Sequence, residues 1–395
     1  MQFVELTPED FKKFAAKSPY KSFYQTPEIA ELREQNGWTA YYFGVKNGQT
    51  LKAAAMIVAK PTFLGKSTFY CPGGPLLDFE DAALTDFFFK HLRRYAKSHN
   101  GYVLHIEPYY ELIQRDRHGE IVKDGFNHRQ ALKNLKTAGL TPRKTSDEPK
   151  YAFVLDLDKR APDELFKQFK QNTRNLIHRA EKKGVTVREL KREELDIFKQ
   201  ITSSTSDRRH FQDKSLSYYE QMYDLFHKSG EVKFLVAEVE VEVEYSNTRG
   251  LIGGTAEIEG ARPVTTGASD PSRESAVSTS AALSVAMFMT YGDEVTYLFS
   301  GSEEKYMKEY NAQYLIQWHM IKYAAEHKYR RYNFYGLQAL PNESKKDYGL
   351  YVFKKSFASD NRGHVTELLG AHEAPVNATF YALHSLLHKL KGLKK

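Results

Sequence analysis

Three stretches of the chain place polar or ionisable side chains beside apolar residues. In YGLYVFKKSF, Lys354 and Lys355 follow aromatic residues, and we expect an aromatic strand whose alternation directs one lysine inward. That lysine is either a snorkelling surface residue or a functional cation, and both interpretations stay open. In YVLHIEP, Glu107 closes a predicted strand, and in YRRYNFYG another predicted strand ends at Tyr335 and Gly336. Strand ends often line sites in α/β folds, so both ends are candidates.

Cationic side chains gather in the stretch ELFKQFKQNTRNLIHRAEKKG, which predicts one basic helix that Gly184 ends. The helix dipole accounts for cations in its last turn. It does not account for those in its first half, which favour a phosphate-binding face. The residues of this cationic set are Lys167, Lys170, Arg174, Arg179 and Lys182.

A second polar stretch, SDRRHFQDKSLSYYEQM, combines Lys214 with two arginines and with Tyr218 and Tyr219. It is either a solvated loop or part of a site for an anionic ligand that carries a ring or a sugar. The stretch YCPGGP, at residues 70–75, is more typical of a tight turn than of a phosphate loop, because no Lys-Ser/Thr pair follows it.

Composition narrows the class of protein. The 395 residues suffice for two domains, and the single cysteine, Cys71, excludes an intramolecular disulfide. The net charge of +7 fits a polyanionic partner as well as it fits a solvated basic surface. GxSxG, HExxH, GxGxxG and CxxC motifs are absent from the sequence. MQFVELTPEDFKKF lacks the apolar core of a signal peptide, so we expect a cytoplasmic protein.

The order of predicted elements occurs twice along the chain. A hairpin, TAYYFGVKNGQTLKAAAMIVAK, precedes a strand, the helix ALTDFFFKHLRRYAKSHN and the strand YVLHIEP. The same order is repeated later in the chain by the stretches EVKFLVAEVE, ALSVAMFMTYGDEVTYLFSGS, AQYLIQWHMIKYAAEHK and YNFYG. We therefore predict an α/β (α+β) protein of two tandem domains, each a mixed twisted sheet flanked by helices. Domain 1 would comprise residues 1–150 and 366–395, and domain 2 residues 151–365.

Two segments stand apart from this repeat. Residues 234–304 contain no lysine, and within them residues 241–281 are rich in Gly, Ser, Thr and Ala, so we expect an insertion in domain 2. The C-terminal stretch ATFYALHSLLHKLKGLKK predicts an amphipathic helix with a stripe formed by Leu383, Leu386, Leu387 and Leu390. This helix either lies on a membrane surface or packs against domain 1, and we favour packing.

The order of these motifs resembles that of the Fem-type (FemABX) aminoacyl-tRNA-dependent peptidoglycan bridge transferases. The stretches that carry the resemblance include SPYKSFYQTPEIAELREQNGW, GGPLLD, YVLHIEP, KQNTRNLIHRAEKKGV, AQYLIQWHMIKYAAEHKYRRYNFYG and DYGLYVFKKSFASD. The resemblance implies two domains similar to the GNAT acyltransferase fold. It also implies transfer of an amino acid from aminoacyl-tRNA to the side-chain amine of a stem peptide. The acceptor would be UDP-MurNAc-pentapeptide or lipid II, and no cofactor or metal is implied.

The resemblance also implies roles for matching positions. Arg33, where the family has a lysine, and Lys214 match cations that hold the precursor's diphosphate, and Tyr218 matches a tyrosine of the same pocket. Phe353 and Lys354 match a Phe-Lys pair beside the tRNA acceptor end. The basic helix described above is the expected tRNA contact.

Two pairs of substrate-binding positions depart from the family pattern. Tyr102 and Glu107 match the first-domain strand, with Glu107 in place of an aspartate. Tyr297 and Phe299 match a Tyr-x-Tyr pair, so the second hydroxyl is missing. Some members carry a coiled-coil arm in domain 2, and the insertion at 241–281 has no heptads with which to form one.

The expected reaction is aminolysis of an ester. An alkylamine with a pKa near 10.4 must lose a proton before it attacks, and the tetrahedral intermediate needs a donor for its oxyanion. We assign Lys354 to the oxyanion or the neighbouring tRNA phosphate, and Glu107 to orienting or deprotonating the amine. We expect a monomer that acts in the cytoplasm, with peripheral contact at the inner membrane face as a second option.

Two alternatives remain. One is a GNAT-type enzyme that uses an acyl-CoA donor, although the chain lacks the Arg/Gln-x-x-Gly-x-Gly/Ala pyrophosphate loop. The other is a non-catalytic tRNA-binding protein, whose affinity would depend steeply on salt and not on aminoacylation.

Overall fold

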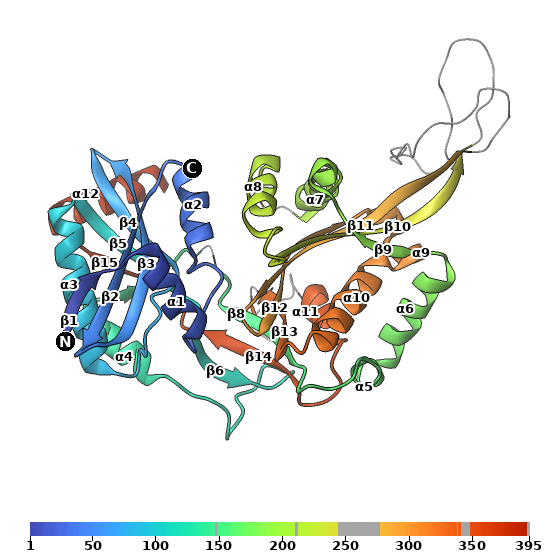
Figure 1. The fold of residues 1–395 in the computed structure, drawn as a ribbon, viewed down its shortest axis with the longest axis horizontal. Coiled ribbons are helices and arrows are strands. Elements are labelled where there is room, and N and C mark those ends of the chain that lie inside the picture. The colour runs from blue at the N-terminus through green and yellow to red at the C-terminus, as the bar shows by residue number, and fades with distance from the viewer. Residues whose placement is uncertain (147, 210–211, 244–276, 338, 341–347, 393–395) are drawn as a thin grey trace, which may run out of the picture. The chain divides into compact units, whose positions relative to one another are not determined.

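The computed structural model in Figure 1 describes residues 1–146, 148–209, 212–243, 277–337, 339–340 and 348–392. The chain divides into two compact units. Unit 1 comprises Met1–Leu155, Asn333–Lys355 and Asn361–Lys395, and unit 2 comprises Asp156–Tyr332 and Ser356–Asp360. The sequence placed residues 151–155, 333–355 and 361–365 in the second domain, whereas in the structure they group with unit 1. The polar strand end around Tyr335 therefore belongs to the unit that contains Glu107.

Unit 1 contains a sheet with the strand order β1-β2-β3-β4-β5-β15-β7. Its first half consists of β1 (Gln2–Glu5), α1 (Pro8–Lys17), α2 (Pro27–Gln35), β2 (Thr39–Asn47), β3 (Thr50–Phe63), β4 (Lys66–Gly73), α3 (Ala82–Ser98) and β5 (Gly101–Pro108). The sheet is completed by β7 (Thr141–Pro142) and β15 (His372–Pro375). β4 and β5 are parallel, and α3 supplies the crossover that a parallel pair requires.

Side-chain alternation in β4 and β5 separates the core of this sheet from its functional face. Phe69 and Cys71 of β4 join Leu104 and Ile106 of β5 in the core, together with the apolar stripe of α3. Glu107 follows Ile106 directly, so it lies on the opposite face of the sheet.

The rest of unit 1 forms a second group of strands, in the order β6-β14-β8-β13. Its elements are β6 (Glu111–Arg115), α4 (Gln130–Thr137), β8 (Tyr151–Asp156), β13 (Arg331–Leu337), α11 (Tyr348–Lys355), β14 (Gly363–Leu368) and α12 (Ala378–Gly392). β14 pairs antiparallel with both β6 and β8, which is why this segment groups with unit 1. β13 starts in unit 2 and passes into unit 1 at Asn333.

Unit 2 contains the strands β12-β11-β10-β9 in that order. Its elements are α5 (Pro162–Lys167), α6 (Gln171–Lys182), β9 (Thr186–Glu189), the 3₁₀ turn η1 (Arg192–Glu194), α7 (Leu195–Arg209), α8 (Leu216–Phe226), β10 (Val232–Val243), β11 (Val277–Tyr291), β12 (Glu294–Ser302), α9 (Glu304–Tyr310) and α10 (Ala312–Glu326). Figure 1 shows α7 and α8 on one face of these strands and α10 on the other. The ends of the predicted insertion form parts of β10 and β11, and residues 244–276 lie outside the described residues.

The predicted repeat is confirmed. β2, β3, β4, α3 and β5 recur in the same order as β10, β11, β12, α10 and β13. The fold is therefore the predicted mixed α/β arrangement of two sheets with flanking helices.

Two predictions about single elements are wrong. The basic helix is broken into α5 and α6, and the break spans residues 168–170. The stretch around Lys354 is the helix α11 and not a strand, because its buried residues, Tyr351 and Lys354, are three positions apart. One of the two lysines, Lys354, does point inward as predicted, but its direction follows from the periodicity of a helix and not from strand alternation.

Candidate functional site

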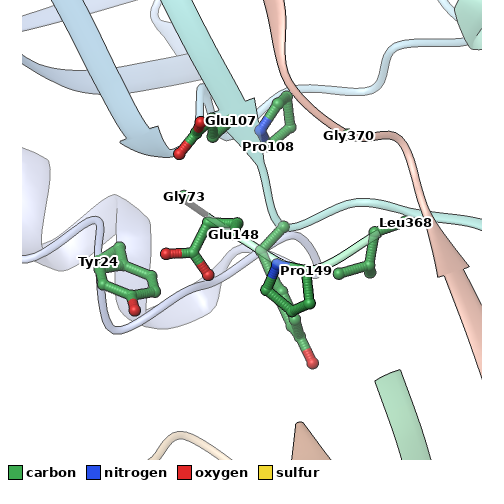
Figure 2. Close-up of a pocket in the computed structure, with 9 residues that line it drawn as sticks. Tyr24, Gly73, Glu107, Pro108, Glu148, Pro149, Leu368 and Gly370 are labelled. Atoms are coloured by element: carbon green, nitrogen blue, oxygen red, sulfur yellow. The ribbon is translucent and has the colours of Figure 1, made fainter. Parts of the chain in front are cut away.

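A pocket lies in unit 1 at the ends of the parallel strands β4 and β5 (Figure 2). It measures about 290 Å³ including the part open to solvent, and it is lined by Tyr24, Gly73, Glu107, Pro108, Tyr109, Glu148, Pro149, Leu368 and Gly370. Its lining thus includes two carboxylates, Glu107 and Glu148, and two tyrosines. Figure 2 shows the carboxylate of Glu148 directed toward Tyr24.

Glu107 is 2% exposed, and its carboxylate is held by several donors. Tyr70 donates a hydrogen bond of 2.5 Å to Oε2, and Ser146 donates one of 3.2 Å to Oε1. Arg143 lies 3.8 Å from Oε1. Burial and the neighbouring Glu107 raise the pKa of Tyr70 well above its usual value, so Tyr70 stays a protonated donor. The carboxylate is therefore fixed in one orientation at the wall of the pocket.

Arg33 contacts Tyr70, the residue that donates a hydrogen bond to Glu107. Its guanidinium lies 5.6 Å from the centroid of the Tyr70 ring, which is within the range of a cation–π contact. Its Nε atom is buried and has no hydrogen-bond partner among the described residues. A buried guanidinium N–H without a partner is costly, so this position suits an added acceptor such as a phosphate oxygen.

The loop before α2 shapes one wall of the pocket. Gln25 is fully buried, donates to the carbonyls of Met56 and Pro72, and accepts from the amide of Met56. These bonds fix the loop against β3 and β4. Gly73 has φ of +64°, and a Cβ there would lie 2.6 Å from Cβ of Tyr24. The first two residues of the pattern PGGP form the end of β4 and not the expected tight turn, and Gly73 lines the pocket.

The end of β13 supplies polar residues that were not among the predicted site residues. Asn333 donates to the Tyr109 hydroxyl at 2.7 Å and accepts from the Tyr335 amide at 2.7 Å. Tyr335 has φ of +59°, which is uncommon for a residue with a Cβ. Its hydroxyl donates to Glu148 and lies 3.4 Å from the hydroxyl of Tyr24. The polar end of YRRYNFYG was the available signal, but the sequence did not reveal its partner Glu148.

Lys354 lies on α11 and is 4% exposed. Its Nζ donates to the carbonyl of Gly336 at 2.6 Å. Desolvation by burial lowers the pKa of Lys354 to about 7. Lys354 is not among the residues that line the pocket, but Gly336 is the neighbour of Tyr335, which binds Glu148. The preceding residue, Phe353, is half-buried on the same helix.

Tyr102 lies away from this group, although it shares β5 with Glu107. The two residues are five positions apart, which is about 16 Å along the strand, and the pairing of β4 with β5 shifts register at Tyr102. Tyr102 accepts a hydrogen bond from Thr68 and contacts the rings of Phe63 and His384. The structure therefore does not bring Tyr102 together with Glu107.

Lys214 and Tyr218 belong to unit 2, at the start of α8. Nζ of Lys214 lies 5.4 Å from the centroid of the Tyr218 ring, and Tyr218 contacts Phe299 edge-on at 6.1 Å. Asp213 holds the turn, because it pairs with Lys199 at 2.6 Å and accepts from the Tyr219 hydroxyl at 2.7 Å. An exposed cation beside an aromatic ring fits the anionic ligand expected from the sequence.

A β-bulge separates Tyr297 from Phe299. The pairing of β11 with β12 shifts register so that Phe288 faces Tyr297 and Met287 faces Phe299. Neighbouring residues of β11 point to opposite faces, so Tyr297 and Phe299 do as well. Tyr297 stacks on Phe288 at 5.4 Å, and burial raises its pKa to about 12. The two residues therefore do not form the one-faced pair that a Tyr-x-Tyr spacing suggests.

The predicted tRNA-binding residues also divide into two kinds. Four are exposed and lie on α5, on α6 or between them: Lys167, Lys170, Arg179 and Lys182. Arg174 is half-buried and donates to the carbonyls of Lys167 at 2.7 Å and Phe169 at 2.8 Å. It closes the C-terminal end of α5, so its charge is engaged within the protein.

The described part of the chain contains no cluster of three or more His, Cys, Asp or Glu residues that could hold a metal. Among the same residues, no helix combines the length and the apolar character needed to cross a bilayer.

Comparison with known proteins assigns a family. The model of the FemAB family matches residues 6–250 and 271–389. Aminoacyltransferase FemB of Staphylococcus epidermidis is 28% identical over 431 residues and covers 100% of both chains. Aminoacyltransferase FemA of Staphylococcus aureus is also 28% identical, over 424 residues, with 99% of each chain covered.

Solved structures agree on the fold. The crystal structure of FemX superposes with a TM-score of 0.74 at 19% identity, and covers 97% of this chain and 99% of its own. A tandem GNAT protein from the clavulanic acid pathway superposes with a TM-score of 0.52 at 11% identity, and covers 95% and 98%. The predicted likeness to tandem GNAT domains is thereby confirmed.

Proposed function

The chain belongs to the FemAB family and is an aminoacyltransferase, and from that premise we propose that it transfers an amino acid from aminoacyl-tRNA to a peptidoglycan precursor. The acceptor atom is the side-chain amine of the stem peptide. The observation that carries this proposal is the buried carboxylate of Glu107 at the wall of a pocket that also contains Glu148.

The pocket suits an alkylammonium acceptor. Two carboxylates and two tyrosines line it, so a primary ammonium group would find acceptors there for its three N–H bonds. Glu107 is held by Tyr70 and Ser146, so it does not need to reorganise when the amine arrives. In this role Glu107 orients the amine and takes its proton, which the amine must lose before it attacks the ester.

We assign Lys354 to the developing oxyanion or to the neighbouring phosphate of the donor. A lysine with a pKa of about 7 is a strong hydrogen-bond donor that is partly charged at neutral pH. In the structure it donates to the Gly336 carbonyl, an acceptor that the substrate oxygen would replace. Because the site is buried, such a donor stabilises an oxyanion more than it would in water.

Charged residues outside the pocket support the remaining assignments. In unit 1, Arg33 with its unpartnered Nε is a group for the diphosphate of the precursor. In unit 2, Lys214 with the neighbouring Tyr218 is a separate candidate contact for an anionic group of the substrate. The exposed lysines of α5 and α6 and Arg179 are the contacts for the tRNA backbone. Arg174 is removed from that set because it binds carbonyls of its own chain.

The test is a transfer assay with a panel of aminoacyl-tRNAs and a lysine-containing UDP-MurNAc-pentapeptide, followed by mass spectrometry of the product. A mass increase of one amino-acid residue is expected, and the increment identifies the donor. Lipid II replaces the soluble acceptor in a second set of reactions, and acetyl-CoA replaces the donor in a third.

The outcomes separate the candidate functions. Acetylation of the acceptor by acetyl-CoA would favour a GNAT-type donor and overturn the proposal. Binding of tRNA without any transfer to either acceptor would favour a non-catalytic tRNA-binding protein. A matched Glu107→Gln variant, assayed in parallel, shows whether any transfer observed depends on the pocket.

A further inference from the structure

One guanidinium in unit 1 lies between the buried carboxylate of the pocket and a second carboxylate on the same sheet. Nη1 of Arg143 lies 3.8 Å from Oε1 of Glu107, and Nε of Arg143 lies 3.8 Å from Oε2 of Glu373. Both distances are too long for a hydrogen bond, so Arg143 acts on each carboxylate through its charge. Glu373 is not among the residues that line the pocket.

The pairing of strands in unit 1 fixes this arrangement. Glu373 on β15 pairs with His105 on β5, and Glu107 follows His105 by two positions, so His105 and Glu107 lie on the same face of β5. Arg143 directly follows β7, which pairs with β15, and its backbone N–H donates to the carbonyl of Ala371 at 2.9 Å. The three charged side chains therefore come from adjacent parts of one sheet.

Glu373 is itself held by two further groups. The Tyr381 hydroxyl of α12 donates to its Oε1 at 2.6 Å, and Nε2 of His105 lies 3.2 Å from its Oε2. The hydrogen bond with His105 is the largest cause of the lowered pKa of Glu373, and Tyr381 and Arg143 lower that pKa further. Glu373 is therefore an anchored anion at neutral pH, and it attracts Arg143 from outside the pocket.

A guanidinium shared in this way meets two opposing requirements on a general base. Burial favours the neutral form of a carboxylate, and a neutral acid cannot take a proton, so a nearby cation keeps the base charged. A cation hydrogen-bonded directly to that carboxylate would occupy oxygen lone pairs that an arriving ammonium needs. Because Arg143 is also attracted by Glu373, it supplies the charge at 3.8 Å and leaves Glu107 open to the amine.

We propose that Glu373 is a positioning residue for aminoacyl transfer, and that it acts by restraining Arg143 beside Glu107. The proton of the acceptor ammonium passes to an oxygen of Glu107, and the freed electron pair of the nitrogen attacks the ester carbonyl. Glu373 takes no part in these bond changes. The inference rests on the proposed function and deepens it, because it assigns a second carboxylate to the same proton transfer.

The test measures kcat and KM for the lysine-containing UDP-MurNAc-pentapeptide, with the aminoacyl-tRNA that the wild type uses at a saturating concentration. Glu373→Gln removes the charge of the anchor and keeps its size. Arg143 would then pair with Glu107 alone and compete with the ammonium, so KM should rise about tenfold while kcat changes less. A merely structural role would reduce the number of active molecules, which lowers the apparent kcat and leaves KM unchanged.

Two substitutions of Arg143 show whether Glu373 acts through it. Arg143→Gln removes the cation, so kcat/KM should fall about tenfold, because less of Glu107 is charged when the amine arrives. Adding Glu373→Gln to this variant should leave KM unchanged, since no cation remains to be restrained. Arg143→Lys keeps the charge but cannot present separate nitrogens to two carboxylates, so it should raise KM as Glu373→Gln does.

Glu9→Gln is the matched control. Glu9 is an exposed residue of α1 in the same unit, and its carboxylate pairs with Lys13 at 3.4 Å. The control therefore removes one glutamate charge and one ion pair far along the chain from the sheet residues above. It should leave both kcat and KM at the wild-type values.

The outcomes separate this inference from the function on which it rests. If the wild type transfers nothing to either acceptor, the proposed function is wrong and the inference is wrong with it. If the wild type is active and Glu373→Gln keeps the wild-type KM, the inference alone is overturned. An equal rise in KM when Glu373→Gln is added to Arg143→Gln would also overturn it, because Glu373 would then act by a route other than Arg143.

Discussion

The buried amine of Lys354 makes the stability of this protein depend on pH in a specific way. Its pKa falls from 10.5 to about 7 because burial disfavours the charged form. Below pH 7 both the folded and the unfolded states carry the proton, so the folded state bears the full cost, which is about 5 kcal/mol. Between pH 7 and 10.5 the unfolded state keeps the proton that the folded state has lost. Stability therefore rises with pH across that window.

The perturbation is Lys354→Met, which keeps the length of the side chain and removes the titrating group. The variant also loses the hydrogen bond to Gly336, a cost of about 1–3 kcal/mol that does not depend on pH. The free energy of unfolding of the variant minus that of the wild type should fall by about 2.5 kcal/mol between about pH 6.5 and about pH 9.

The assay is urea denaturation followed by tryptophan fluorescence. Trp38 lies in unit 1 with Lys354, whereas Trp318 lies in unit 2, so both proteins carry Trp318→Phe and the signal reports unit 1. Lys133→Met removes an exposed lysine of α4 and controls for the loss of one positive charge. If the difference between variant and wild type is the same at both pH values, Lys354 is not the buried, low-pKa amine described above.

Three further predictions concern other parts of the molecule. Glu107→Gln should lower kcat by about 10²–10³-fold, because it removes the group assigned to the amine proton, while Tyr70→Phe, which keeps the carboxylate, should cost less; equal activity of Glu107→Gln and the wild type would make Glu107 structural. Gly73→Ala should destabilise the protein by about 1–3 kcal/mol, measured by thermal unfolding, since φ is +64° and the new Cβ would lie 2.6 Å from Cβ of Tyr24; an unchanged Tm would contradict the close packing at Gly73. Arg174→Ala should lower stability by about 1–3 kcal/mol because it leaves two carbonyls without their donor, whereas Arg179→Ala should leave Tm unchanged and reduce the salt dependence of tRNA binding; the reverse pattern would restore Arg174 to the tRNA contacts.

The repeat and the fold class follow from local sequence. Hydrophobic periodicity and turn residues are short-range signals, and Asn47-Gly48 and the turn at Gly292 ended strands where they were expected. The helix α3 begins after Asp81, whose side chain accepts from the amide of Leu84. The order of strand, hairpin, strand, helix and strand could therefore be predicted in both halves of the chain. The tandem architecture followed from this repeated order.

Most of the pairings between side chains in the candidate site come from contacts between segments that are distant in the sequence. Glu107 was a candidate because it ends a strand, but its partners Tyr70 and Ser146 come from other parts of unit 1. Glu148 accepts a hydrogen bond from Tyr335, which lies 187 positions later in the sequence, so no local pattern could predict this pair. Lys354 was identified by type, yet its inward direction depends on α11 being a helix, which the aromatic pattern did not reveal.

The sequence by itself determined the types of element, their order and the kinds of side chain that can bind anions, amines and tRNA. Only the tertiary structure decided which of these groups are buried, paired or exposed. Arg174 and Arg179 are the same residue type on the same helix, yet one caps α5 and the other is exposed. Leu386 fits the stripe of a packed helix, yet it is exposed because α12 packs through His384. The physical reason is that burial and pairing depend on which surfaces meet in space, and that depends on contacts between residues far apart in the chain.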